Sequence, residues 1–137
     1  MNAARRIVLV SGAPGAGKST LAAPLAARLN FPLLAKDAIK ETLFDALGGV
    51  AGDLAQSRLF CGAAMETLWT LAAHCPAVVL EANFRPRSAH ERARIAALGG
   101  AVVEVYCACP REEAARRFAA RAAAGVHPAH FRTSLSE

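Results

Sequence analysis

Two kinds of hydrophobic pattern alternate along the chain. Short continuous apolar runs, which are typical of strands buried in a parallel sheet, occur at residues 7–11, 31–35, 77–83 and 101–107. Segments in which apolar residues recur at helical spacing lie between and after these runs, at residues 19–29, 38–47, 53–74, 88–98 and 110–124. This order predicts four strands that alternate with helices, and five helices in all.

Apolar residues mark the face that three of the helices would bury. These faces carry Leu21, Leu25 and Leu29 on the first helix, Ile39, Leu43 and Leu47 on the second, and Phe60, Ala64, Leu68 and Leu71 on the third. Residues 53–56 and 88–91 have the spacing of a capping box and are expected to begin two helices, and glycine pairs at 48–49 and 99–100 are expected to end two. Strands joined by crossover helices favour a three-layer α/β fold with a mostly parallel sheet covered on both faces. At 137 residues, we expect a single domain over residues 1–137.

A glycine-rich sequence follows the first predicted strand and fits the pattern G-x-x-x-x-G-K-[ST] in the required context between a strand and a helix. Glycines allow backbone N–H groups to point toward phosphates, and the positive end of the next helix favours anions there. Lys18 would reach the β and γ phosphates, and Ser19 would offer a hydroxyl ligand to Mg²⁺. The sequence therefore predicts a P-loop NTPase fold that binds ATP and Mg²⁺. The predicted nucleotide contacts are Gly12, Ala13, Pro14, Gly15, Ala16, Gly17, Lys18, Ser19 and Thr20.

Asp37 follows the second predicted strand, at the edge of the sheet where open α/β folds bind ligands. A carboxylate there could orient a substrate hydroxyl and accept its proton during phosphoryl transfer. The alternative is that Asp37 only caps a helix that begins at Ala38, because Asp is a preferred N-cap residue. The two roles are compatible.

Glu81 ends the third apolar run in the manner of a Walker B acid, which holds Mg²⁺ or its water. We therefore predict Ser19 and Glu81 as metal ligands, although Glu81 could also be an ordinary carboxylate at a strand end. Asn83 and Arg85 follow it and are predicted, with Asp37 and Glu81, to contact the substrate; a solvated basic loop is the alternative for Arg85.

Two arginines, Arg117 and Arg121, are four residues apart and share a face of the last predicted helix. They could close over the phosphates as a lid and neutralise charge on the γ-phosphoryl oxygens, or they could form a solvated stripe. We predict Lys18, Asp37, Arg117 and Arg121 as the catalytic residues. His127 and His130 form an H-x-x-H pair beyond that helix, but a metal site would need a third ligand.

The chain has a formal net charge of +5, which suits a polyanionic partner such as a nucleotide or nucleic acid. Its basic residues are spread along the sequence, and one Tyr and one Trp offer little surface for base stacking, so a nucleic-acid partner is disfavoured. The N-terminus has no signal-peptide pattern and no apolar stretch could span a bilayer, which favours a cytoplasmic protein without a membrane partner.

Several segments together resemble the AAA_33 or zeta-toxin-like group of P-loop kinases, whose relatives include chloramphenicol phosphotransferase-like and gluconate kinase-like enzymes. The resemblance covers nearly the whole chain and rests on residues 11–21, 34–41, 79–85, 117–121 and 127–130. It implies that Asp37 is the base on the substrate side and that Arg117 and Arg121 are lid arginines. Members of this group continue past the His-Pro segment into a fifth strand and a helix that help form the adenine pocket. Because this chain ends at Glu137, the resemblance implies a sheet without its last strand, an exposed fourth strand and weak adenine binding.

These observations predict an ATP-dependent kinase that transfers the γ-phosphoryl group to a hydroxyl of a small molecule. Two alternatives use the same P-loop. One is an ATP-binding or ATPase module without kinase activity, and the other is a nucleic-acid end kinase.

Overall fold

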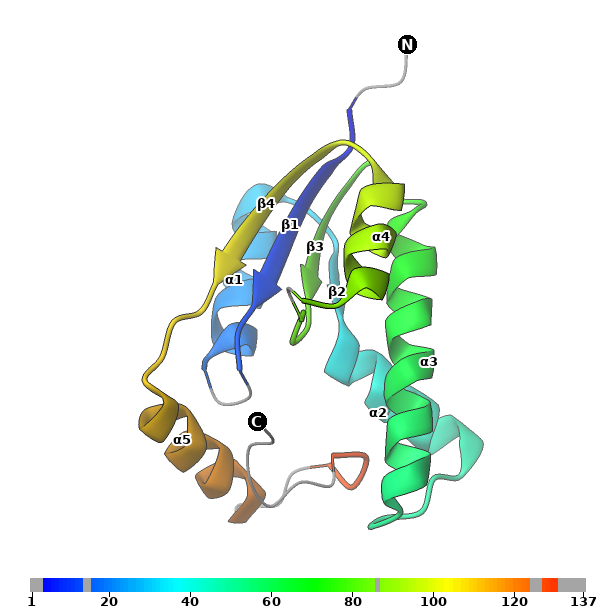
Figure 1. The fold of residues 1–137 in the computed structure, drawn as a ribbon, viewed down its shortest axis with the longest axis vertical. Coiled ribbons are helices and arrows are strands. Elements are labelled where there is room, and N and C mark those ends of the chain that lie inside the picture. The colour runs from blue at the N-terminus through cyan, green and yellow to red at the C-terminus, as the bar shows by residue number, and fades with distance from the viewer. Residues whose placement is uncertain (1–3, 14–15, 86, 124–126, 131–137) are drawn as a thin grey trace.

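Four parallel strands form the centre of the molecule, and all of them end at the same edge of the sheet (Figure 1). The computed structural model describes residues 4–13, 16–85, 87–123 and 127–130. In chain order the elements are β1 (Arg6–Ser11), α1 (Lys18–Leu29), β2 (Leu33–Ala35), α2 (Lys36–Leu47), α3 (Leu54–Ala72), β3 (Ala77–Glu81), α4 (Ala89–Leu98), β4 (Ala101–Tyr106) and α5 (Arg111–Ala123).

The strand order is β2-β3-β1-β4, so the first strand lies inside the sheet between β3 and β4. The register pairs Val10 with Glu81 of β3 on one side and with Val105 of β4 on the other. On the far side of β3, Ala35 at the end of β2 pairs with the same Glu81. The predicted α/β class with a parallel sheet is therefore confirmed, and the register brings the ends of β1, β2 and β3 together.

Alternate side chains of the central strands enter two separate cores. Ile7, Leu9, Val78 and Leu80 are buried on the face covered by α3 and α4. Val10 and Val79 face the opposite way and are buried against Ala22 and Ala26 of α1. This alternation is the period of two that a strand imposes, and burial on both faces explains why β1 and β3 are continuously apolar.

The predicted buried face of α1 is wrong at two of its three positions, whereas Leu25 packs beside the core. Leu21 and Leu29 are 39% and 41% exposed, whereas Ala22 and Ala26 are buried against the sheet. Small side chains let the helix axis approach the strands closely, and on an alanine-rich helix leucine alone does not mark the inner face. Two residues predicted on the buried faces of other helices are also exposed, namely Leu47 of α2 at 67% and Leu71 of α3 at 44%.

The predicted helix starts at the two capping boxes are confirmed. The Asp53 side chain accepts a hydrogen bond from the Gln56 backbone N–H, and the Ser88 side chain accepts one from that of Glu91. Gly48 ends α2 in the left-handed conformation, at φ 72°, which favours glycine.

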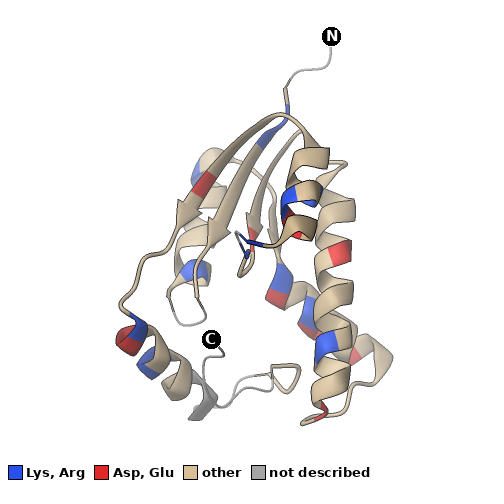
Figure 2. Cartoon of the chain, in the orientation of Figure 1, with Lys and Arg blue, Asp and Glu red and all other residues tan. Residues whose placement is uncertain are grey.

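The fourth strand is an exposed edge in the described part of the chain, as the resemblance implied. Val103 and Tyr106 are 58% and 64% exposed, so the burial on both faces that the apolar run alone would predict does not hold for this strand. Along its inner side β4 pairs with β1 over Ala101–Tyr106. Lys and Arg, shown in Figure 2, are distributed over several helices and β1, and they form no single stripe in that view.

Candidate active site

The segment after β1 carries the geometry of a phosphate-binding loop in its described residues. The Lys18 Nζ donates hydrogen bonds to the backbone carbonyls of Gly12 and Ala13, at 2.8 and 3.1 Å, so the ammonium lies within the loop. Gly17 is the N-cap of α1 at φ 94°, and no side chain caps the helix. Pro14 and Gly15, both predicted nucleotide contacts, lie outside the described residues.

The start of α1 fits a phosphate group. Its first turn contains no acidic residue, so the positive end of the helix and its backbone N–H groups keep their affinity for an anion. A β-carbon at Gly12, where φ is 146°, would lie 3.0 Å from the Cys107 carbonyl oxygen, so only glycine fits there. Thr20, another predicted contact, lies in the first turn and is exposed.

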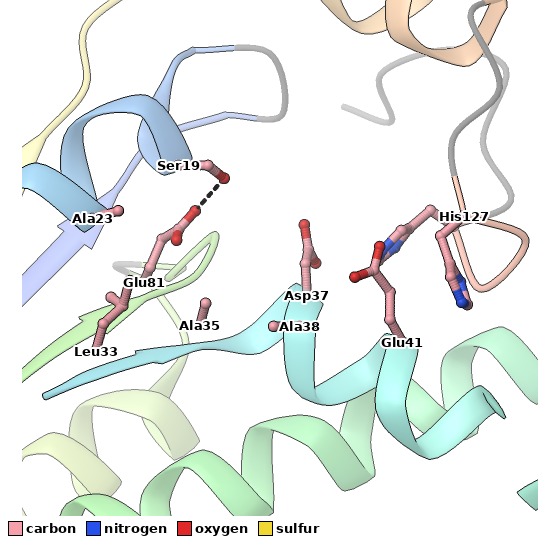
Figure 3. A pocket seen from close by; sticks show the side chains of 10 residues that line it. Ser19, Ala23, Leu33, Ala35, Asp37, Ala38, Glu41, Glu81 and His127 are labelled. Carbon is pink, nitrogen blue, oxygen red and sulfur yellow. Dashed lines mark hydrogen bonds and ion pairs between the residues drawn. The ribbon is translucent and has the colours of Figure 1, made fainter. Parts of the chain in front are cut away.

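Two predicted metal ligands that are far apart in the sequence meet at the loop. The Ser19 hydroxyl donates a hydrogen bond to Glu81 Oε1 at 2.8 Å (Figure 3). Glu81 is only 8% exposed, and the parallel register holds it at the end of β3 beside β1 and β2. A hydroxyl and a buried carboxylate are oxygen donors of the kind that Mg²⁺ prefers, so the donor set fits this ion.

Asp37 lies in the first turn of α2, and its interpretation as an N-cap is wrong. The helix begins at Lys36, directly after β2, and its N-cap is Ala35, which makes no side-chain hydrogen bond. The Asp37 carboxylate forms an ion pair with the Lys36 Nζ at 3.0 Å and is 64% exposed. With capping excluded, the side chain is available for chemistry at the end of the sheet.

Charge keeps the Asp37 carboxyl ionised at neutral pH. Partial desolvation raises its pKa. The positive charge of Lys36, a hydrogen bond from Lys36 and the charge that His130 carries in the acid range outweigh this effect, so the pKa lies below its usual value of 3.8. An ionised carboxylate can accept a proton, which is what a base requires.

A cavity of about 420 Å³ connects these groups. Figure 3 shows Ser19 and Glu81 on one side of it, Asp37 at its centre and Glu41 with His127 on the other side. Its lining consists of Ser19, Ala23, Leu33, Ala35, Asp37, Ala38, Glu41, Glu81, His127 and His130. We call this space the acceptor cavity, because it begins at the phosphate-binding loop and leads away from it past Asp37.

The H-x-x-H pair closes the far side of the acceptor cavity. Because His127 Nδ1 accepts a hydrogen bond from the Ala129 N–H, its Nε2 carries the proton and donates to Asp45 at 2.9 Å. The His130 Nε2 lies 3.1 Å from Glu41 Oε1, and Ala129 is buried. Both histidines thus bind carboxylates of α2 and form a wall. Among the residues that the structure describes, no group of three His, Cys, Asp or Glu could hold a metal ion.

Glu41, His127 and His130 were not among the predicted site residues. The signal for Glu41 was its position, four residues after Asp37, which places both on one face of α2. The histidines stood out as an H-x-x-H pair, but the sequence did not indicate where they would lie. Their place depends on contacts with α2 and α3 that are distant in sequence, such as the hydrogen bond from the Ser57 hydroxyl to the Ala129 carbonyl oxygen.

Asn83 and Arg85 do not line the acceptor cavity. They belong to a second cavity of about 400 Å³, whose lining consists of Ala13, Asn83, Phe84, Arg85, Arg87 and Tyr106. The Arg85 backbone N–H donates to Glu91 Oε2. This cavity borders the phosphate-binding loop at Ala13, but the structure does not bring its arginines together with Asp37.

Arg117 on α5 lies close to the phosphate-binding loop. A β-carbon at Gly17 would lie 4.0 Å from the Arg117 Nη1, and the Arg117 Nε donates to Glu113 at 3.1 Å. Glu113 also forms an ion pair with Arg116. Arg121 follows one turn later on α5, and its side chain lies outside the described part of the structure. The lid role of both arginines remains a prediction.

Comparisons with known proteins agree with this geometry. A sequence model of the AAA_33 family, an AAA domain, matches residues 7–135. The chain belongs to the AAA_33 family. The predicted resemblance to this group of P-loop kinases is confirmed. No curated protein matches the sequence significantly.

Solved structures with the same fold include kinases. The AAA_33 chain is 30% identical to a candidate kinase from Chloroflexus aurantiacus J-10-fl, with a TM-score of 0.82, over 91% of this chain and 70% of the other. It is similar in fold to a gluconokinase from Sinorhizobium meliloti 1021, with 21% identity, a TM-score of 0.58 and coverage of 86% and 66% of the two chains. A shikimate kinase from Bacteroides thetaiotaomicron gives 23% identity, a TM-score of 0.58 and coverage of 92% and 71%. Among the described residues, no helix is long and apolar enough to cross a membrane.

Proposed function

We propose that this AAA_33 protein is an ATP-dependent kinase that phosphorylates a hydroxyl group of a small molecule in the acceptor cavity. The observation that carries the proposal is the position of Asp37. Its ionised carboxylate projects into the cavity that begins at Ser19 and Glu81 (Figure 3). A base at this position suits proton removal from a hydroxyl held close to the γ-phosphate.

The transfer uses groups on both sides of the reacting phosphorus. The acceptor hydroxyl oxygen attacks the γ-phosphorus in line, the bond to the bridging oxygen of ATP breaks, ADP leaves and the Asp37 carboxylate takes the hydroxyl proton. The Lys18 ammonium and the amides at the start of α1 bind the phosphates, and Arg117 neutralises charge on the γ-phosphoryl oxygens.

Ser19 and Glu81 would hold Mg²⁺. When bound, the ion neutralises charge on the β and γ phosphates. The Ser19 hydroxyl now donates to Glu81 at 2.8 Å, and the same two side chains would turn their oxygen lone pairs toward the ion. Glu81 stays fixed by the register of β3 while Ser19 is fixed by the first turn of α1.

The test is transfer of labelled phosphate from Mg²⁺-ATP to a panel of hydroxyl compounds, with the wild-type chain and Asp37→Asn. The substitution removes the base and keeps the shape of the side chain, so the rate of phosphate transfer should fall by about 10²-fold to 10⁴-fold. Binding of Mg²⁺-ATP, measured as a rise in the thermal unfolding temperature, should remain. Full transfer by Asp37→Asn would show that Asp37 is not the base. Hydrolysis of ATP that is unchanged in the variant, without transfer to any member of the panel, would favour the ATPase alternative.

A further inference from the structure

The acceptor cavity is acidic over the lining that the structure describes. Three of its residues are carboxylates, Asp37, Glu41 and Glu81, and its described lining contains no Lys or Arg. Glu81 is engaged with Ser19 at the phosphate end. The other two carboxylates lie where the acceptor would bind, so they bear on which acceptor the cavity accepts.

Asp37 and Glu41 are one helical turn apart on α2. At this spacing their β-carbons are separated by about 5–6 Å, and Figure 3 shows both carboxylates projecting into the same space. One molecule the size of a six-membered ring can therefore contact both side chains. Asp37 is nearer to Ser19, so the reacting hydroxyl would bind at Asp37 and a different group would bind at Glu41.

The negative charge of Glu41 has an uncharged partner at neutral pH. Its carboxylate accepts a hydrogen bond from His130, and burial lowers the pKa of that imidazole below its usual value of 6.5. A neutral imidazole satisfies one carboxylate lone pair and leaves the charge in place. Lys40, the next residue, donates to the Ser57 hydroxyl of α3 at 2.8 Å, and its charge helps to keep the His130 imidazole neutral.

Among the residues that the structure describes, no arginine lines the acceptor cavity. Arg85 and Arg87 line the second cavity and are separate from the lining of the acceptor cavity. Lys36 is already paired with Asp37 at 3.0 Å. An acceptor carboxylate beside Glu41 would meet a like charge in a partly desolvated space, which is unfavourable, whereas an ammonium group would meet an opposite one.

We propose that the acceptor is an amino alcohol of about the size of an amino sugar, with its hydroxyl at Asp37 and its protonated amine at Glu41. This inference rests on the proposed kinase function. The phosphate ester forms at the hydroxyl oxygen and the Asp37 carboxylate takes the hydroxyl proton, while the ammonium keeps its protons and serves only to bind and orient the acceptor. Specificity follows from the charge of Glu41, because a carboxylate-bearing acceptor of the same size is repelled.

The test compares three six-carbon compounds that differ in charge: D-glucosamine, D-glucose and D-gluconate. Their dissociation constants are measured by calorimetry with Mg²⁺ and a non-hydrolysable ATP analogue present. We expect D-glucosamine to bind about tenfold more tightly than D-glucose, as for one partly solvated ion pair, and D-gluconate to bind most weakly. Glu41→Gln should remove the preference for D-glucosamine, and Glu41→Lys should reverse the order of D-glucosamine and D-gluconate.

Glu104→Gln is the matched control, because Glu104 is an exposed carboxylate on β4 away from both cavities; it should leave the ranking unchanged. Equal or tighter binding of D-gluconate, absence of binding by D-glucosamine, or an unchanged ranking in folded Glu41→Lys would overturn the proposal. Binding of the ATP analogue separates failure of the kinase function from failure of this inference. A chain that does not bind the analogue lacks a working P-loop. A chain that binds the analogue and phosphorylates D-gluconate best is a kinase with another specificity.

Discussion

At the scale of single residues, Arg117 is the cation of α5 that the described structure places beside the phosphate-binding loop. Its Nη1 lies 4.0 Å from the position of a β-carbon on Gly17, and its Nε is held by Glu113. A guanidinium fixed in this way can neutralise charge that develops on the γ-phosphoryl oxygens. Arg117→Ala should therefore slow single-turnover hydrolysis of Mg²⁺-ATP, in which water replaces the acceptor, by about 10²-fold or more.

Arg116 offers a matched control for this prediction. It pairs with the same Glu113 but its side chain is 75% exposed, so Arg116→Ala removes a similar charge without removing a group beside Gly17. We expect hydrolysis by this variant to stay within about twofold of the wild type, since a surface ion pair contributes little. Equal losses in the two variants would mean that only the net charge of α5 matters.

The Ser19–Glu81 contact shows how far the sequence could predict the site. The two residues are 62 positions apart, but Glu81 ends one predicted strand and Ser19 begins the helix after the loop that follows another. Parallel strands place such residues at one edge of the sheet. The position of Asp37 at this edge could be predicted by the same rule. Arg85 and Asn83 also follow a strand end, but the chain turns after β3 and places them in the second cavity, which strand-end position alone does not encode.

At the scale of elements, the short segment 127–130 is held against α2 and α3 and forms part of the cavity wall. Phe44 and Phe60 pack with Ala129 in one small core, and the His127 ring meets Phe44 edge-on at 5.5 Å between centroids. No periodicity marks a segment of four residues, so its place could not be predicted. The helix starts could be predicted, because a capping box is local, whereas the inner face of α1 depended on how closely alanine lets the helix approach the sheet.

Titration of His130 should make the attachment of this segment depend on pH. The groups that face the imidazole are Asp37, Lys40 and Glu41 of α2, with the His127 ring at 6.2 Å. Burial lowers its folded-state pKa below 6.5, and Lys40 acts in the same direction, whereas Asp37 and Glu41 oppose the shift. Because the unfolded chain then binds more protons, the contribution of His130 to the free energy of unfolding is complete above about pH 6.5 and is lost as the pH falls through the folded-state pKa.

Urea denaturation at pH 7, 6 and 5 measures this effect. The wild-type chain should lose more free energy of unfolding between pH 7 and pH 5 than His130→Asn does. His90→Asn serves as the control, because His90 is 69% exposed and pairs with Glu66 on the surface. The free energy of unfolding of this variant should depend on pH as it does in the wild type. The same pH dependence in the wild type and His130→Asn would mean that the His130 imidazole is not the group responsible.

At the scale of the whole molecule, the sheet is well covered at β1 and β3, and over the residues that the structure describes it is open at β4. Val102 and Val103 are 40% and 58% exposed on opposite faces of this edge strand, and an exposed apolar edge favours pairing with another chain. We expect light scattering to show association of the purified chain that increases with concentration, and Val103→Lys to reduce it. Thr70→Lys, at an exposed position of α3, adds the same charge away from β4 and should not reduce the association. An equal reduction of association in both variants would mean that the added net charge, and not the edge strand, is responsible.

The central claim is that the described loop, helix and carboxylates form a competent nucleotide site. Thermal unfolding of the wild-type chain and Lys18→Ala, each with and without Mg²⁺-ATP, tests it most directly. At a ligand concentration of about 100 times Kd, binding to the native state adds about 2.7 kcal/mol, which for a chain of this size raises Tm by on the order of 10 °C. The account predicts this rise in the wild type and its loss in Lys18→Ala; an equal rise in both, or none in either, would contradict it.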